Sequence, residues 1–431
     1  MRARTVIVGG GVVGISIALH AARRSDPLKE PVMLLESKTI GEGSDALSGA
    51  VLSQYFASRD AGGMARDSLR YYRGIEERTA RSLGYLASGA LTLPSGSTEA
   101  DRVRLRETVE MLRTLGVEID IVEAARIREL FPGIQIEDGA IGAWEPSAGC
   151  LDPNRALTAM TTLARNRGAI IREGTGVDRL IVEEGRVVGV ETSDGRIDCD
   201  DVVIASGSGT RKLLAPLGVE LPIEFVRAEY SYMASTVEQP DEVALESSMV
   251  TAGPEASGAT GWYPGGFVRP ADADGDHADS FEQESQALRI AHPVLTDPDK
   301  GFYIRCDPLN SRVTVGRRGE ASFRTVDDPD TFDPSVSREF LAWARGVVEE
   351  RLPKYEDVHE IGAETRLFTR MPDGEPLLGS VTSLPGLHVA CALSTKGFTL
   401  APSVGEGMAQ MVLGEPNSAF DAELYSPMRY L

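Results

Sequence analysis

The chain has 431 residues, of which 42% are hydrophobic and 25% charged, and it carries a formal net charge of −21. This length allows two or more globular domains, and the negative charge argues against binding nucleic acid or an anionic membrane surface. No run approaches the roughly 20 apolar residues of a membrane-spanning helix, and the first residues lack a secretory signal, so we expect a cytoplasmic protein.

The cysteines and histidines argue against two further classes of protein. The four cysteines form no C-x-x-C pair, and the five histidines form no H-E-x-x-H motif. Scattered cysteines of this kind are typical of free thiols in a reducing compartment. We therefore expect neither a disulfide framework nor a metal site.

The chain begins with a strand–loop–helix pattern that is typical of dinucleotide binding. Residues 6–8 predict a buried parallel strand, and residues 12–24 predict a helix with one apolar face. Between them, Gly9, Gly11 and Gly14 have the G-x-G-x-x-G spacing. In this pattern the glycines permit a tight turn, a close approach of the backbone to a diphosphate, and the packing of helix on strand.

The next strand supplies the acid that this pattern leads us to expect. Residues 32–36 are apolar up to Glu36, which follows Gly14 by 22 positions. An acid here favours a cofactor with a free ribose 2′-hydroxyl, FAD or NAD rather than NADP. We expect the diphosphate at the free N–H groups of Val12 and Val13, where the helix dipole is positive.

The elements that follow alternate between helices and strands. Two charged amphipathic helices are predicted at 60–81 and 98–115, on either side of a strand at 90–93. Asp152 is the predicted N-cap of a third helix over 153–167, because an acid before proline is a typical helix start.

The remaining predicted elements fall into three groups. An α/β group has strands at 169–172, 177–182, 186–192, 197–199 and 202–205. An insertion from 221 to 358, which we expect to form an antiparallel sheet, has strands at 225–233, 301–305 and 312–315, an acidic loop at 271–279 and a helix at 335–350. A last α/β group has a strand at 387–390, a glycine-containing loop at 394–397 and a helix at 399–413.

Five stretches, in this order, resemble the D-amino-acid-oxidase superfamily, which includes sarcosine oxidase, glycine oxidase and dimethylglycine dehydrogenase. They are the 9–14 loop with Glu36, the loop at 43–50, the Gly-x-(aliphatic)-Asp-Pro stretch at 149–153, the turn at 203–207, and the C-terminal pair at 371–379 and 392–398. The C-terminal pair is the most specific, because 371–379 is similar to the family's Thr-Pro-Asp-Gly-x-Pro stretch. The resemblance implies bound FAD and oxidation of the carbon–nitrogen bond of amines and amino acids.

The resemblance and the glycine loop together indicate the residues that bind FAD. These are Gly9, Gly11, Val12, Val13, Gly14, Glu36, Ser37, Ser44, Ser48, Gly49, Val177, Ala205, Ser206, Gly207, Arg366, Ser394, Thr395, Lys396, Gly397 and Phe398. Arg366 stands where sarcosine oxidases carry the cysteine that bonds to the flavin, so we expect non-covalent FAD. Lys396 stands where many members have histidine, and Thr395 replaces a glycine.

Arg305 and Tyr303 are the expected substrate-binding residues, because 301–305 resembles the strand from which amino-acid oxidases present an arginine to the substrate carboxylate. Strand alternation places both on one face, and a guanidinium binds a carboxylate in bidentate fashion. Tyr303, as an acid–base group, and Lys396, as a positive charge beside flavin N1 and C2=O, are the expected catalytic residues. The alternative is that these residues have structural roles only: Tyr303 as part of a pocket wall, Lys396 as a surface lysine and Arg305 as a surface arginine of an edge strand.

The predicted fold is α/β: a Rossmann-like FAD-binding domain (1–58, 141–220 and 359–431) interleaved with an α+β substrate domain (59–140 and 221–358) on an antiparallel sheet. The predicted function is hydride transfer from the α-carbon of an amino acid or N-alkyl amino acid to flavin N5, giving an imine that hydrolyses. Oxygen or an electron-transfer partner then reoxidises the flavin. A 2-hydroxy-acid dehydrogenase and a non-catalytic flavin-bearing subunit remain as alternatives, and the oligomeric state stays open.

Overall fold

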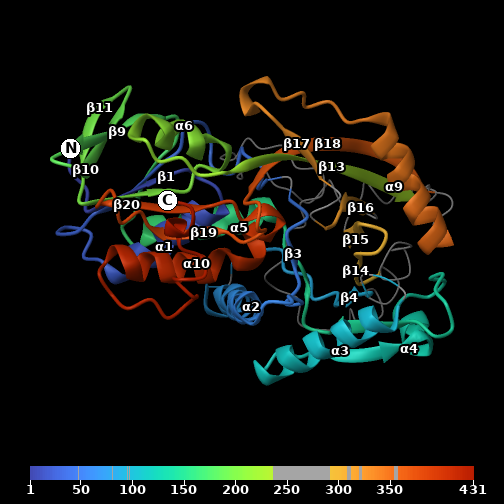
Figure 1. Ribbon diagram of the computed structural model, residues 1–431. Helices are drawn as coiled ribbons and strands as arrows, with labels where there is room; N and C mark the ends of the chain where they lie inside the picture. The colour runs from blue at the N-terminus through green and yellow to red at the C-terminus, as the bar shows by residue number, and fades with distance from the viewer. Residues whose placement is uncertain are drawn as a thin grey trace, which may run out of the picture.

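The computed structural model describes residues 1–46, 48–79, 81–94, 96, 98–235, 292–307, 312–319, 323–353 and 358–431. The predicted acidic loop at 271–279 and Leu47 of the 43–50 loop lie outside these ranges. The described chain forms two large sheets with helices around them, which makes a mixed α/β fold (Figure 1).

The first sheet has six strands, with the N-terminal strand β1 in its interior. Its order is β19 (Leu377–Ser380), β20 (Leu387–Cys391), β12 (Asp201–Ile204), β1 (Thr5–Val8), β2 (Val32–Leu35) and β8 (Ile170–Arg172). All neighbours pair in parallel except β19 with β20. Its four inner strands are short and almost wholly buried, as expected for a parallel sheet covered on both faces.

Helices cover one face of this sheet, and a small sheet covers the other (Figure 1). The helices are α1 (Val12–Arg24), α2 (Arg59–Thr79), α5 (Pro153–Asn166) and α10 (Gly397–Val412), and α1 packs against both α5 and α10. The other face carries β9 (Val177–Glu183), β10 (Arg186–Thr192), β11 (Gly195–Asp198) and α6 (Thr210–Leu214). Strand alternation divides the two cores: Ile7 packs with the helices, and Val6 and Val8 pack on the opposite side.

The second sheet has nine strands and draws them from both halves of the chain. Its order is β17 (Arg324–Val326), β13 (Glu224–Ser235), β16 (Arg312–Arg317), β15 (Phe302–Asp307), β14 (Val294–Asp297), β4 (Ala90–Thr92), β6 (Ile141–Glu145) and β5 (Asp120–Glu123), and β18 (Val358–Arg370) also pairs with β13. The strands pair antiparallel except β14 with β4.

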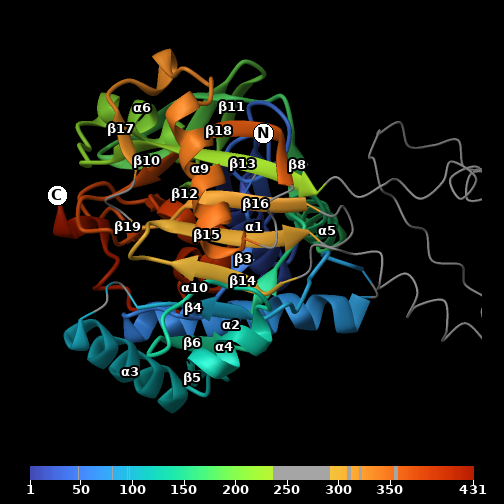
Figure 2. The ribbon, with the colours of Figure 1, turned by 90° about the vertical axis from the view of Figure 1, so that its right-hand side faces the viewer.

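Three helices border the second sheet. Figure 2 shows α9 (Arg338–Arg351) lying across the face that is turned away from the first sheet. There Phe340, Ala344 and Val348 pack in one core with Phe302 and Val315. α3 (Glu99–Thr114) and α4 (Ala124–Leu130) lie at the end formed by β5 and β6 (Figure 2).

Short elements complete the described chain. β3 (Val51–Leu52) pairs with β7 (Gly149–Cys150), and the 3₁₀ turns are η1 (Gly207–Gly209), η2 (Ala215–Leu217), η5 (Pro329–Thr331), η7 (Ser394–Lys396) and η8 (Pro427–Arg429). Within the described ranges, none of the helices combines the length and hydropathy needed to cross a bilayer. The same residues bring together no group of His, Cys, Asp and Glu side chains suited to a metal ion.

The predicted helices are all present, with ends shifted by at most a few residues. The caps explain this agreement: the Asp152 side chain accepts from the Arg155 N–H at 2.9 Å, and Thr98 forms a capping box with Asp101. Strand pairing places some segments differently from the predicted domain boundaries. β6, within 141–220, and β18, which except for its first residue lies within 359–431, pair in the nine-stranded sheet, whereas α2 packs against α10 in the core of the first sheet.

Candidate functional site

A cavity of about 860 Å³ extends from the carboxyl ends of the parallel strands to the second sheet. Its lining includes Gly9 after β1, Glu36 after β2 and Ala205 after β12, and on the second sheet Tyr230 of β13 and Tyr303 of β15. The carboxyl edge of a parallel sheet is where open α/β folds bind ligands, and the volume lies within the roughly 300–1,000 Å³ of small-molecule sites. The cavity therefore joins a dinucleotide-type loop to the second sheet.

The glycine loop has the close packing that its sequence predicts. Gly9 has a φ of +115°, a conformation that L side chains rarely adopt. A Cβ on Gly9 would overlap the carbonyl of Ala205, and a Cβ on Gly14 would overlap the carbonyl of Gly9. The Gly14 position thus lets α1 start directly beneath the loop, which directs the N–H groups of its first turn toward the cavity.

Glu36 supports the glycine loop as well as lining the cavity. One carboxylate oxygen accepts the Gly10 N–H at 2.7 Å, and the other accepts the Lys38 N–H at 2.8 Å. An ionised carboxylate can accept further hydrogen bonds, so its oxygens remain suited to ribose hydroxyls.

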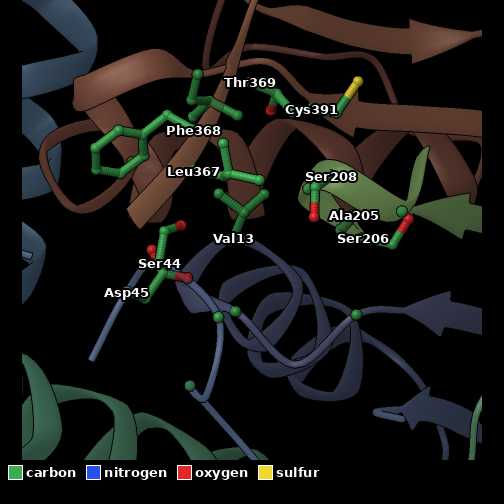
Figure 3. Close-up of a pocket in the computed structure, with 18 of the residues that line it drawn as sticks. Val13, Ser44, Asp45, Ala205, Ser206, Ser208, Leu367, Phe368, Thr369 and Cys391 are labelled. Carbon is green, nitrogen blue, oxygen red and sulfur yellow. The ribbon is translucent and has the colours of Figure 1, made fainter. Parts of the chain in front are cut away.

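The loop after β2 adds a second acid to this end of the cavity. Figure 3 shows Ser44 and Asp45 close to the start of α1, with Val13 nearby. The Asp45 carboxylate accepts the Val12 N–H at 2.8 Å, and it acts as an N-terminal cap from outside the helix. Burial raises the pKa of the Asp45 carboxyl, and this hydrogen bond opposes the shift. Asp45 is not among the residues predicted from the sequence, although it lies next to the predicted Ser44.

The wall of the cavity on the second sheet carries two tyrosines, Tyr230 and Tyr303. Tyr303 and Tyr230 lie opposite the same residue, Gly316 of β16, which pairs with both strands. A Cβ on Gly316 would lie 2.5 Å from Tyr303 Cε1, so the absence of a side chain at this position makes room for the ring. Burial raises the pKa of both phenols well above the usual range, so both remain protonated near neutral pH.

Arg305 lies on β15 two positions from Tyr303, but among the described residues it is not part of the cavity lining. Its side chain is 7% exposed, and its Nη1 donates to the Leu151 carbonyl at 3.3 Å. Sheet register places it opposite Thr314, which in turn lies opposite Tyr232. The guanidinium is therefore a buried cation behind the tyrosine end of the cavity.

Residues of the loop before α10 line the cavity, but the Lys396 side chain points elsewhere. Its Nζ donates to the Gly374 carbonyl at 2.8 Å and lies 3.7 Å from Glu375 Oε2. Ala392 and Ser394 have positive φ values, 61° and 52°, a strain that is common where backbone is held at a functional site. This placement does not support the predicted catalytic role of Lys396.

Most of the residues predicted to bind FAD line this one cavity. They are Gly9, Gly11, Val13, Glu36, Ser37, Ser44, Ser48, Gly49, Val177, Ala205, Ser206, Gly207, Ser394, Thr395, Gly397 and Phe398. Within the described chain, Val12, Gly14, Arg366 and Lys396 are outside the lining. Arg366 lies on β18 opposite Ala228, and its Nη1 donates to the Thr365 carbonyl at 2.9 Å.

One wall of the cavity is absent from the residues predicted from the sequence. Leu367, Phe368 and Thr369 of β18 lie across from Val13, as Figure 3 shows, and Cys391 lies near them at the end of β20. β18 has no regular alternation of buried and exposed residues, so its sequence carries little strand signal. The sequence signals that this part of the chain reaches the site were the neighbouring Pro-Asp-Gly stretch and the expected position of Arg366, next to Leu367.

The chain is similar along its whole length to known oxidoreductase sequences. It is 27% identical over 438 residues to 4-methylaminobutanoate oxidase (formaldehyde-forming) of Paenarthrobacter nicotinovorans, a match that covers 98% of this chain and 46% of that protein. It is 28% identical over 442 residues to mitochondrial dimethylglycine dehydrogenase of Mus musculus, which covers 100% of this chain and 44% of that protein. The chain thus spans less than half the length of these two curated relatives.

A match to a solved structure and a match to a family model agree with this sequence similarity. The crystal structure of L-proline dehydrogenase from P.horikoshii has a TM-score of 0.79 and 21% sequence identity, and the match covers 100% of this chain and 98% of that chain, which shows a shared fold. The family model described as DAO, FAD dependent oxidoreductase, matches residues 4–275 and 259–411. The chain therefore belongs to this family of FAD-dependent oxidoreductases, whose cofactor is FAD.

Proposed function

We propose that this protein uses non-covalently bound FAD to oxidise the CH–NH bond of an amino acid or an N-alkyl amino acid. The observation that carries the proposal is the cavity, which joins the diphosphate-type glycine loop to a wall of buried tyrosines on the second sheet. Bound FAD supplies a hydride acceptor, N5, so the protein has to bind, orient and shield the reactants. The imine product hydrolyses in water.

Different groups of cavity residues are suited to different parts of the cofactor and substrate. The first turn of α1 and the carboxylate of Glu36 are suited to the diphosphate and the ribose. The backbone from Ser394 to Phe398 lies at the start of α10, where a positive helix end favours developing negative charge. The protonated Tyr303 and Tyr230 are suited to donating hydrogen bonds, not to accepting a proton from the substrate.

Arg305 is the proposed partner of the substrate carboxylate. It shares a strand face with Tyr303, and burial strengthens the attraction between a guanidinium and a carboxylate. The names of the relatives agree with a substrate of this kind: 4-methylaminobutanoate, dimethylglycine and L-proline are all carboxylates with a substituted amine. We therefore favour secondary and tertiary amino acids within the broader class.

The thiols support non-covalent FAD. Cys391 lines the cavity, but burial raises the pKa of its thiol to about 12. The thiolate is the reactive form of cysteine, so this thiol is a poor nucleophile near neutral pH. Acid precipitation should leave FAD in the supernatant, and yellow colour retained on the precipitated chain would contradict the proposal.

We also propose two domains, built around the two sheets. The segments 1–58, 141–220 and 359–431 remain the basis of the FAD-binding domain, with β6 and β18 counted with the second sheet and α2 with the first. Oxygen or an electron-transfer partner is the proposed acceptor for the reduced flavin, and the cytoplasm is the proposed location.

The decisive test is anaerobic bleaching of the bound flavin. The holoprotein is mixed without oxygen with amino acids, their N-methyl derivatives and the matching 2-hydroxy acids, and the flavin absorbance is followed. We expect bleaching by amines and faster bleaching by N-alkylated ones. Bleaching by hydroxy acids alone would favour a hydroxy-acid dehydrogenase, and no bleaching by any of them would favour a non-catalytic flavoprotein.

A further inference from the structure

The Asp45 carboxylate lies at the end of the cavity where the proposed function needs a diphosphate to bind. It accepts the Val12 N–H at 2.8 Å, which is one of the unsatisfied donors at the start of α1. Its Oδ2 also lies against Gly11, since a Cβ on that glycine would be 2.5 Å from the oxygen. The carboxylate and a diphosphate would therefore share one positive helix end (Figure 3).

No neighbouring cation offsets this charge in the described part of the chain. Two buried phenols, Tyr72 of α2 and Tyr230 of β13, interact electrostatically with Asp45, and burial keeps both of them protonated. From the side of α10, Gly397 faces Asp45 Oδ1, and the adjacent Lys396 is turned toward Gly374. The main stabilising contact is the Val12 N–H.

We propose that Asp45 links FAD binding to protonation, so that the carboxylate takes up a proton from solvent when the diphosphate enters the cavity. The inference rests on the proposed binding of FAD at α1. A diphosphate brings negative charge close to this half-buried carboxylate, and like charges at short range favour the neutral acid. Burial by the protein alone already raises the pKa of Asp45, which lowers the cost of this step.

Protonation also changes what Asp45 can do. An ionised carboxylate only accepts hydrogen bonds, whereas a neutral carboxyl also has one O–H to donate. Asp45 can then keep the Val12 N–H on one oxygen while the protonated oxygen becomes a donor. The same side chain thus caps α1 without the cofactor and ceases to repel an anion when the cofactor is present.

The test measures FAD binding to the full-length apoprotein from pH 5.5 to 8.5 by quenching of flavin fluorescence. If one proton is taken up together with FAD, the Kd for FAD rises with increasing pH, by up to about ten-fold per pH unit at the alkaline end of this range. We expect Asp45→Asn to bind FAD more tightly than the wild type at pH 8.5 and to lose this slope. Glu42→Gln is the matched control: Glu42 is on the same loop but exposed and paired with Lys38 at 2.9 Å, so the slope should persist.

A measurement on the wild type alone keeps the proposal testable if Asp45→Asn does not fold. Titration calorimetry at pH 7.5 in buffers of different ionisation enthalpy reports the number of protons taken up, and we expect a value approaching one. Equal slopes in the wild type and Asp45→Asn, or no proton uptake, would overturn the role of Asp45 alone. Failure of the wild type to bind FAD at any pH would instead overturn the proposed function.

Discussion

Glu145 is a fully buried carboxyl whose surroundings favour the protonated form. It is 0% exposed, accepts the Ser53 hydroxyl at 2.7 Å and the Gln54 N–H at 2.6 Å, and thereby ties the chain after β3 to β6. Burial raises its pKa from 4.5 to about 7, although these hydrogen bonds act in the other direction. The acid is thus neutral in the folded protein at pH values where it is ionised in the unfolded chain.

This difference predicts a pH-dependent stability. Below pH 4.5 both states hold the proton, and between pH 4.5 and about 7 only the folded state does, so the free energy of unfolding falls as pH rises through this window. The loss from this one group is about 3 kcal/mol. Glu145→Gln should remove it, and the variant should gain stability relative to the wild type from pH 5 to pH 8.

Urea denaturation at pH 5 and pH 8 measures the effect. Glu123→Gln is the control, because Glu123 is an exposed carboxylate at the end of the neighbouring strand β5. Its pH dependence should match that of the wild type. A Glu145→Gln variant with an unchanged pH dependence would show that Glu145 is ionised in the folded protein.

Arg305 carries the prediction on substrate affinity. Charge-assisted hydrogen bonds are worth about 1.5–3 kcal/mol, so Arg305→Met should weaken substrate binding about 10- to 150-fold. Arg305 is not among the residues proposed to bind FAD, so flavin content should not change. Anaerobic titration of the flavin absorbance with the best amine gives the Kd. The control is Arg324→Met, which removes an exposed arginine paired with Glu339 and should leave the Kd unaltered.

At the scale of elements, α1 can begin next to the glycine loop only because Gly14 has no side chain. A Cβ on Gly14 would overlap the Gly9 carbonyl, so Gly14→Ala has to move the helix away from the glycine loop. We expect the variant to lose FAD affinity at least ten-fold and to be destabilised by about 1–3 kcal/mol. Gly63→Ala is the matched change, because Gly63 lies in α2 and a Cβ on it would meet no packed neighbour within 4 Å.

The two alanine substitutions should have different effects on the free energy of unfolding. Alanine is a better helix former than glycine by up to about 1 kcal/mol, so Gly63→Ala should be neutral or stabilising and bind FAD normally. Thermal unfolding and flavin content of the purified proteins measure both effects. Normal flavin binding by Gly14→Ala would mean that the loop does not need its close contact with α1.

Local signals explain which elements could be predicted from the sequence. α1 and α5 follow clear helix-start signals, the Gly-x-Gly loop and the Asp152-Pro153 pair, and their predicted starts match the structure. β18 could not be predicted because it is defined by its partner: twelve of its residues lie opposite residues of β13, more than a hundred positions earlier. The cavity wall that it supplies, Leu367 to Thr369, was missed for the same reason.

At the scale of the molecule, the same contrast separates the two ends of the cavity. The cofactor end is built mostly from short loops whose residues are close in sequence, so a motif could reveal it. The tyrosine end is assembled from β13, β15, β16 and β18, and only the register between distant strands brings Tyr230, Gly316 and Tyr303 together. Alternation along one strand indicates which face a side chain takes, but it does not identify the residue that lies opposite on a strand distant in sequence.

Because residues of both sheets line one cavity, FAD should stabilise the whole molecule and not the first sheet alone. A ligand that binds only the folded state adds RT ln(1 + [L]/Kd), about 2.7 kcal/mol at one hundred times the Kd. We expect a single thermal transition of the apoprotein whose midpoint rises with FAD concentration.

Fragments of the cofactor separate the contributions of the two ends. ADP carries the diphosphate and the ribose that the α1 end and Glu36 are suited to bind, so it should raise the melting temperature and compete with FAD. FMN lacks the adenosine part and one of the two phosphates, and it should stabilise much less at the same concentration. If FMN matched FAD while ADP had no effect, most of the binding free energy would come from the flavin part of the cofactor, and the glycine loop would position the cofactor without contributing much to its affinity.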